Sequence, residues 1–400
     1  MKKKLPLFIF VDALGFDLLR RHPEFMQDQA PERKELETIF GYSSACDPSI
    51  ISGLLPSQHL MWSSFYYSPE TCPYRWVRFL RFLPSAVANY HRVRHYISRL
   101  IKWVHGFTGY FQIYNVPFRL LPNFDYAEKY SIWGRDGVLK GRTIFSELLE
   151  RGIPYYCDPE NYDDRAKIAD LKQAVSEESI DFAYILLGKL DATMHGVGTR
   201  HPDVKQLLDW YHAQLSDLIQ TAKQHYEDVP VYIFSDHGMH DVKGGFNLQA
   251  SIDGLGLRFG LDYAVVYDST MARFWCFNDV ARQRIHEHLD GLESVGRIVP
   301  DDELEALGVY FADAMYGDTV FLMHSGVVIA PSHMGRKAIP GMHGFHPSDP
   351  ESKAAILSNK PLPVALRSIE QIYWLMVNEM GLEISAHPGL EPIAQTARGS

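Results

Sequence analysis

An aspartate and a histidine stand side by side where an apolar stretch of the chain ends. The segment VYIFSDHGMH (231–240) runs from apolar residues straight into Asp236 and His237. A single aspartate after a strand usually caps a helix or forms a turn. An adjacent Asp-His pair has little structural purpose at such a point, so we interpret it as part of a functional site.

Two other predicted strands lead into side chains of the same kind. The stretch 5–11 runs into Asp12, and the stretch 182–188 is followed by Asp191, with His195 four residues later. Taken alone, Asp12 fits a cap or turn, and Asp191 and His195 fit a contact across one helical turn. The recurrence at three strand ends favours a shared function.

A glycine-rich loop near the end of the chain, GMHGFHP, adds His343 and His346, which could also be surface histidines. In open α/β sheets, functional groups gather at the carboxyl ends of the strands, so we expect these Asp and His side chains to converge. Carboxylate oxygens and imidazole nitrogens suit zinc, and manganese or iron could also bind them. The sequence therefore predicts a site for two divalent metal ions, most suited to zinc.

A serine-rich segment, GYSSACDPSIISGLLPSQH (41–59), could supply a nucleophile to such a site. Paired metal ions commonly promote in-line displacement at phosphorus. Asp47 and Pro48 resemble a cap and a first-turn proline, so we expect a short helix to begin there. A hydroxyl just before a helix N-terminus would place a phosphate near free N–H groups. A plain serine-rich loop is the alternative.

The elements that must position these residues form an α/β pattern. Apolar runs predict buried parallel strands, and helical periodicity predicts the segments between them. The predicted strands are 5–11, 153–157, 182–188 and 229–235, and the predicted helices are 141–152, 163–178 and 201–226. We therefore expect one domain over residues 1–400, a mostly parallel central sheet with helices on both faces.

Two segments interrupt this alternation. Residues 60–140 are rich in aromatic residues and arginine and are predicted to form a mostly helical insertion. That insertion could be a lid, a surface for a partner or a membrane, or ordinary helical packing. Residues 250–340 are predicted to form a small α+β insertion.

Bulk properties limit the class of protein. Lysine and arginine total 39 and aspartate and glutamate 49, a net charge of −10, which disfavours nucleic-acid binding. Four scattered cysteines do not predict a disulfide framework. No run of 18 apolar residues occurs, so no membrane span is expected. The start resembles a signal peptide but is interrupted by Asp12, so we expect a cytoplasmic protein, with export as the alternative.

The order of the motifs resembles the alkaline phosphatase superfamily, and most closely its type I phosphodiesterase/nucleotide pyrophosphatase branch. The motifs are Asp12, SIISGLLPSQH, DATMH, SDHGM and HGF, and the late stretches GDTVFLMHSGVVIAPS and IEQIYWLMVNEMGLE also fit that branch. The resemblance implies an alkaline phosphatase-like fold and a two-metal site. One metal ion would be held by Asp191, His195 and His343, and the other by Asp12, Asp236 and His237.

The resemblance also implies a serine nucleophile. Counting back from Gly53 selects Ser43, which would form a phospho-seryl intermediate; Ser44 is a second candidate, and counting from Pro48 selects Cys46. Cys46 stands where many relatives have a phosphate-binding asparagine. Backbone N–H of Ser44 could replace that donor in part.

The substrate expected from these residues is a small phosphodiester or pyrophosphate, and a nucleotide-like molecule is one candidate. Lys189 is the one nearby cation, and Trp62 and Tyr66 could stack on a leaving group or pack in the core. A phosphomonoesterase, a sulfatase, a phosphonate hydrolase or a phosphate-transferring mutase of the same fold stays open. So does a catalytically inactive binding protein. The oligomeric state is not predicted.

Overall fold

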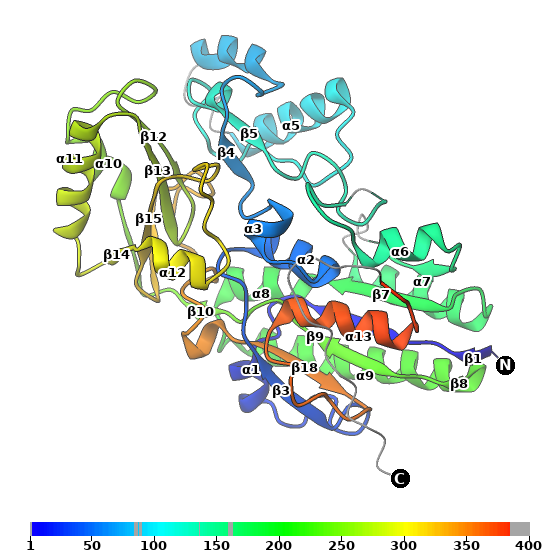
Figure 1. Cartoon of the computed structure of the whole chain (residues 1–400). Coiled ribbons are helices and arrows are strands. Elements are labelled where there is room, and N and C mark those ends of the chain that lie inside the picture. The colour runs from blue at the N-terminus through cyan, green and yellow to red at the C-terminus, as the bar shows by residue number, and fades with distance from the viewer. Residues whose placement is uncertain (1, 84–86, 88–89, 136, 159–162, 385–400) are drawn as a thin grey trace.

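The computed structural model describes residues 2–83, 87, 90–135, 137–158 and 163–384. A six-stranded sheet in the order β3-β18-β9-β2-β7-β6 forms its centre (Figure 1). The four strands that the sequence predicts are parallel to one another: β2 (Leu7–Val11), β6 (Tyr155–Tyr156), β7 (Phe182–Leu187) and β9 (Val231–Phe234). The predicted α/β architecture is confirmed.

Two further strands extend the sheet at one edge. The strand β18 (Ala354–Ser358) runs antiparallel to β9, and β3 (Glu32–Leu36) runs antiparallel to β18. The sequence did not predict either strand. The sequence of β3, ERKEL, is mostly polar because it forms the outer edge, where one side of a strand faces solvent.

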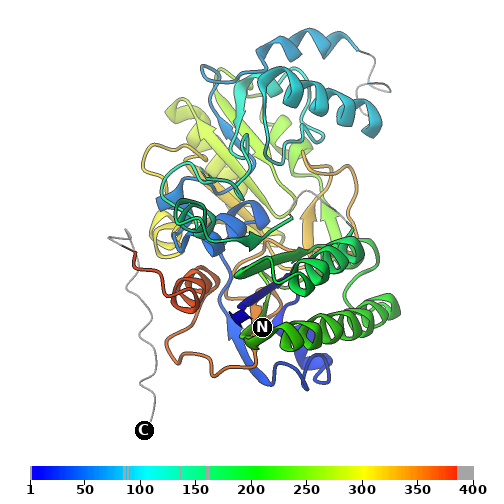
Figure 2. The same cartoon turned by 90° about the vertical axis from the view of Figure 1, so that its right-hand side faces the viewer.

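Both faces of the sheet are buried, as parallel sheets require. Along β2, Phe8 and Phe10 point into one core, whereas Leu7 and Ile9 point into the other. The first core is covered by α2 (Ser43–Ser52), α6 (Ile144–Glu150) and α13 (Ile372–Glu379). The second is covered by α1 (Phe16–Arg21), α7 (Asp164–Ser176), α8 (Lys189–Val197) and α9 (Pro202–His225). Figure 2 shows the layers from the side.

Residues 250–340 build a second, smaller sheet, in agreement with the predicted α+β insertion. Its antiparallel order is β12-β13-β15-β14. The strands are β12 (Tyr263–Tyr267), β13 (Met271–Cys276), β14 (Gly296–Val299) and β15 (Thr319–Met323), with the helices α10 (Leu248–Asp253), α11 (Asp279–Asp290) and α12 (Asp301–Ala306).

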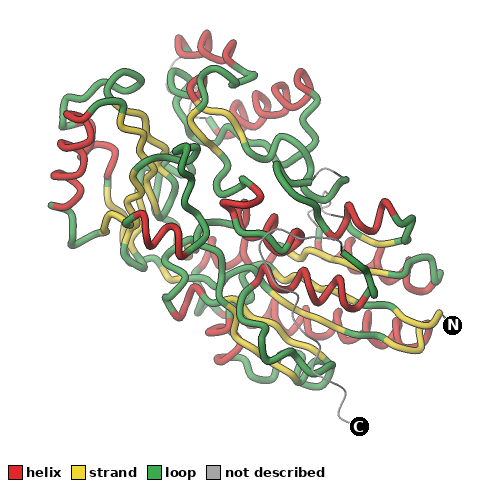
Figure 3. The backbone as a smooth tube through the Cα atoms, in the orientation of Figure 1, coloured by secondary structure: helices red, strands yellow, loops and turns green. Residues whose placement is uncertain are grey.

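Residues 60–140 are less helical than expected. The strands β4 (Phe65–Tyr67) and β5 (Phe124–Tyr126) pair as an antiparallel stem. Beyond the stem, the described helices are η1 (Arg75–Phe82), α5 (His91–His105) and η2 (Leu121–Asn123), and much of the rest is loop (Figure 3). Part of this predicted insertion, including residues 84–86, lies outside the described residues.

Short elements complete the chain: α3 (Pro56–His59), β1 (Lys2–Lys4), β8 (Tyr226–Asp228), β10 (His240–Asp241), β11 (Gly244–Phe246), β16 (Val327–Ile329), β17 (Gly341–Met342), η3 (Pro350–Ser352) and η4 (Ile369–Gln371). Among the described residues, no helix is both long enough and apolar enough to cross a bilayer.

Candidate two-metal active site

Three neighbouring strands bring the predicted carboxylates to one edge of the sheet. Asp12 follows β2, Asp191 lies in the first turn of α8 after β7, and Asp236 follows β9. Because β7, β2 and β9 are adjacent and parallel, their carboxyl ends lie together. The same arrangement places His237 beside Asp236.

The first predicted ligand group comes together as one cluster. One ligand atom from each of Asp191, His195 and His343 lies within 4.8 Å of the others. The Nε2 atoms of His195 and His343 lie 3.2 Å and 3.7 Å from Asp191 Oδ1. His195 Nδ1 lies 2.8 Å from the carbonyl oxygen of Gly341, a contact that orients the ring and leaves Nε2 for a ligand.

The second group lies against the first. His237 Nε2 is 3.0 Å from Asp236 Oδ2 and 3.7 Å from Asp12 Oδ1. His237 Nδ1 lies 2.9 Å from the carbonyl oxygen of Gly238, which fixes the ring in the same way. One ligand atom from each of Asp12, Asp191 and His237 also lies within 4.8 Å of the others, so Asp191 belongs to both clusters. The rings of His237 and His343 stack with centroids 3.7 Å apart.

The unsatisfied polar atoms of this cluster fit two cations. Asp12 Oδ1, Asp191 Oδ1 and Asp236 Oδ2 are buried without a hydrogen bond in the described part of the chain, and so is His343 Nδ1. Buried polar groups are nearly always paired, and three carboxylates in one place repel one another. Divalent cations would satisfy these atoms and offset the charge, and the oxygen and nitrogen donors suit zinc, manganese or iron.

The electrostatics of the site reflect the same crowding. Burial and the nearby carboxylates of Asp236 and Asp191 raise the pKa of Asp12 well above its usual value. Burial and the neighbouring imidazoles of His237 and His195 lower the pKa of His343 well below its usual value. The neutral imidazole that results is the form that binds a metal ion.

Metal removal should therefore destabilise the protein in a pH-dependent way. A chelator is expected to lower the Tm by about 5 °C or more at pH 8, because it leaves the ionised carboxylates unpaired. Since the folded pKa of Asp12 is raised, its contribution to stability is present at low pH and lost as the pH rises. The Tm difference with and without chelator should thus shrink towards pH 5, as thermal melts can measure. An equal difference at both pH values would contradict this electrostatic account.

The predicted nucleophile lies next to the second cluster. Ser43 is the first residue of α2, and its Oγ lies 3.3 Å from His237 Nε2. The helix begins earlier than expected: Tyr42 is its N-cap, with extended backbone, and Asp47 and Pro48 lie inside the helix. The predicted start at Asp47 was therefore wrong. The first N–H groups of a helix lack partners within the helix and can bind an anion such as phosphate.

The C-terminus of α2 depends on glycine. Gly53 has a φ of +68°, and a Cβ there would lie 2.7 Å from the ring of Tyr373. Glycine adopts this left-handed conformation without steric cost, so it ends the helix that carries Ser43.

Residues 7–345 match the family described as type I phosphodiesterase / nucleotide pyrophosphatase. The chain belongs to this family. Membership makes it a phosphoric ester hydrolase and accounts for the order of the motifs. No curated protein sequence matches the chain.

Solved structures of ectonucleotide pyrophosphatase/phosphodiesterase 5 share the fold. The murine protein is 14% identical, with a TM-score of 0.66 over 98% of both chains. The human protein is 13% identical, with a TM-score of 0.67 over 98% of this chain and 97% of that chain. An inactive threonine-to-alanine variant of the murine protein, in complex with AMP, is 14% identical, with a TM-score of 0.63 over 98% of this chain and 97% of that chain.

In this phosphodiesterase family member, two of the residues predicted to contact the substrate are buried in the core. Cys46 is fully buried in the core, with Sγ near Thr38 Oγ1 at 3.8 Å. Trp62 is 1% exposed and donates a hydrogen bond from Nε1 to the carbonyl of Phe40 at 2.5 Å. These two side chains pack the core and offer a substrate no accessible surface.

The remaining candidates differ in exposure. Tyr66 donates its hydroxyl proton to Asp125 Oδ2 at 3.1 Å, at the stem of the insertion. Lys189 is exposed and lines a separate surface depression with Trp210. Ser44 is partly exposed, directly after Ser43. His346, which was only a loop candidate, lies 2.8 Å from Glu303 through Nε2.

Two residues near the site were missed by the sequence analysis. The ring of Tyr42 packs edge-on against the ring of His343, with centroids 5.7 Å apart. The Tyr42 hydroxyl lies 2.7 Å from Thr270 Oγ1, and this hydrogen bond connects the small sheet to the site. Asp47 lies one helical turn after Ser43, with a buried Oδ1 that has no hydrogen bond in the described residues. Burial and the charges of Asp236 and Glu128 raise the pKa of Asp47 well above its usual value.

Proposed function

We propose that this protein hydrolyses a phosphodiester or pyrophosphate bond in a small, nucleotide-like molecule through a phospho-seryl intermediate. The observation that carries the proposal is the position of Ser43, whose Oγ lies 3.3 Å from His237 Nε2 at the start of α2. A nucleophile beside a cluster of metal-ligand side chains is an arrangement that supports two-step phosphoryl transfer.

The chain's own residues divide the reaction between them. Ser43 Oγ attacks phosphorus in line, and the leaving oxygen departs with the electron pair of the broken P–O bond. Water then attacks the Ser43 phosphate ester and releases the serine with its proton restored. Two divalent cations, held by Asp191, His195 and His343 and by Asp12, Asp236 and His237, would lower the pKa of the hydroxyl and offset phosphate charge. The N–H groups at the start of α2 would orient the phosphate.

The charges around Ser43 favour a diester over a monoester. A monoester carries a second negative charge that needs a cation. Lys189 lies in a separate depression, and buried Arg273 is already bonded to Asp268 at 2.9 Å. Asp47 adds no positive charge at any pH, and it adds negative charge near the nucleophile only where the pH exceeds its raised pKa. The AMP in the complex of the inactive murine relative supports a nucleotide-like substrate.

A small substrate panel tests the proposal. The full chain, loaded with zinc or manganese, should hydrolyse bis-(p-nitrophenyl) phosphate and the p-nitrophenyl ester of a nucleoside monophosphate with higher kcat/KM than p-nitrophenyl phosphate or p-nitrophenyl sulfate. Faster hydrolysis of the monoester or the sulfate would assign the protein to a phosphomonoesterase or sulfatase activity. No turnover of any substrate with metal bound would assign it to a binding role.

Asp47→Asn should shift this preference. At a pH above the raised pKa of Asp47, removing its negative charge should raise kcat/KM for the dianionic monoester about tenfold relative to the diester, corresponding to about 1.4 kcal/mol. The ratio of the two kcat/KM values measures the effect. Asp217→Asn, an exposed carboxylate on α9, should leave the ratio unchanged. An unchanged ratio in Asp47→Asn would mean that Asp47 does not influence substrate choice.

We also propose that the protein works in the cytoplasm. All four cysteines are free thiols, which is usual in reducing compartments. Cell fractionation with an antibody to the full chain would test this location.

A further inference from the structure

The insertion carries a charge opposite to that of the whole chain. Residues 71–124 contain seven arginines and one lysine and no aspartate or glutamate, in a protein with a net charge of −10. A cationic segment of this length on an acidic protein concentrates positive potential at one place.

The same segment exposes large apolar side chains. Phe79 and Phe82 on η1 are 65% and 75% exposed, and Tyr96 and Trp103 on α5 are 65% and 80% exposed. Both helices bury their other side in a small core of the insertion, through Val77 of η1 and Ile101 of α5. Each helix already packs one face against this core, so packing within the described part of the insertion does not account for the exposed rings.

Arginines stand directly among these rings. The guanidinium groups of Arg78 and Arg81 lie 5.0 Å and 4.7 Å from the ring centres of Phe79 and Phe82. In Figures 1 and 2, α5 lies at the end of the molecule opposite the chain termini. We call the exposed residues of this end the η1–α5 surface: Arg78, Phe79, Arg81, Phe82, Tyr96, Arg99 and Trp103.

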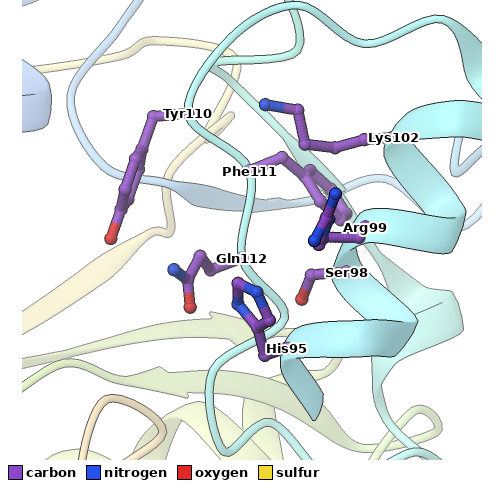
Figure 4. A pocket seen from close by; sticks show the side chains of 7 residues that line it. All are labelled: His95, Ser98, Arg99, Lys102, Tyr110, Phe111 and Gln112. Atoms are coloured by element: carbon purple, nitrogen blue, oxygen red, sulfur yellow. The ribbon is translucent and has the colours of Figure 1, made fainter. Parts of the chain in front are cut away.

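A small pocket of about 260 Å³ adjoins this surface (Figure 4). His95, Arg99 and Lys102 line it at helical spacing, together with Gln112. Lys102 Nζ donates a hydrogen bond to the carbonyl oxygen of Gly109 at 2.6 Å, which holds the amine at the pocket. Cationic donors on one helix face suit the phosphate of an anionic headgroup.

We propose that the η1–α5 surface binds the face of an anionic lipid bilayer. Exposed tryptophan, tyrosine and phenylalanine lie at the level of the headgroups, and arginine and lysine attract anionic lipids; the two together distinguish interfacial binding from a purely electrostatic nucleic-acid surface. The protein would lie on the membrane and not span it, in keeping with the lack of a spanning helix among the described residues. This inference does not depend on the proposed function.

Vesicle co-sedimentation with the full chain tests the proposal. We expect the protein to bind vesicles of phosphatidylcholine mixed with phosphatidylglycerol, and to bind phosphatidylcholine vesicles weakly. Phe82→Ser with Trp103→Ser, and separately Arg78→Glu with Arg81→Glu, should weaken binding to the anionic vesicles about tenfold or more. High salt should weaken it as well.

Matched controls come from α9, from α11 and from the loop before β12. Leu261 and Val280 are 55% and 65% exposed, so Leu261→Ser with Val280→Ser removes similar apolar exposure. Lys205→Glu with Arg284→Glu reverses two exposed charges. Both control pairs should bind vesicles as the wild type does, and all variants should hydrolyse a soluble p-nitrophenyl diester equally, which separates this proposal from the proposed function.

Any of four outcomes would overturn the proposal, three of them in binding assays. These three are equal binding to both vesicle types or to neither, equal loss of binding in the control pairs, and binding of RNA that depends on the same residues. A concentration-dependent dimer in sedimentation, abolished by the Phe82→Ser and Trp103→Ser pair, would assign the surface to a second copy of the chain and would likewise overturn it.

Discussion

Ser43→Ala should reduce kcat/KM for a diester at least about 10³-fold and leave the metal content unchanged. The physical reason is that the variant lacks the oxygen that attacks phosphorus, while all six proposed ligands remain. Ser43 Oγ lies 3.3 Å from His237 Nε2, which places the hydroxyl at the ligand cluster. We expect its removal to leave the fold intact. Steady-state kinetics and elemental analysis of the same protein sample measure both quantities.

Ser44→Ala is the matched control for this experiment. Ser44 is the next residue of α2 and was the second candidate for the nucleophile. We expect this variant to keep most of its activity. If Ser44→Ala loses turnover while Ser43→Ala keeps it, the two assignments must be exchanged.

Asp191→Asn should have the second largest effect, because Asp191 belongs to both ligand clusters. An amide is a neutral and weaker ligand than a carboxylate, so both ions should bind more weakly and activity should fall at least about 10²-fold. Metal titration by calorimetry and kcat/KM at saturating metal measure the two losses. High metal concentration should restore part of the activity.

A carboxylate outside the clusters provides the control. Asp164 is buried and accepts hydrogen bonds from the backbone N–H groups of Gly188 and Lys189. These two residues directly precede the segment that carries Asp191. Asp164→Asn should lower stability without changing the number of metal ions bound. Equal metal affinity in wild type and Asp191→Asn would contradict the role given to Asp191.

The fold was predictable where runs of apolar residues mark buried strands. The apolar runs at β2, β7 and β9 identified the centre of the sheet because parallel strands are buried on both faces. The strand β3 was not predictable, because its polar sequence ERKEL pairs only through backbone contacts with β18, more than 300 residues away. Local sequence carries no signal for such pairing.

The site was predictable where strand ends carry its residues, as at Asp12 and Asp236. Side chains whose role depends on packing were not. Trp62 could have faced a ligand or the core, and only its contact with the carbonyl of Phe40 and its burial decide for the core. Asp47 was missed because the true start of α2, at Ser43, puts it on the nucleophile's side of the helix.

The most direct test of the account is a crystal structure of the zinc-loaded protein with anomalous diffraction measured at the zinc edge. The account predicts two ions, each about 2.0–2.2 Å from its ligand atoms. One ion should contact Asp191, His195 and His343, and the other Asp12, Asp236 and His237, with Ser43 Oγ beside the second. A single ion, or ions bound away from these six side chains, would contradict it.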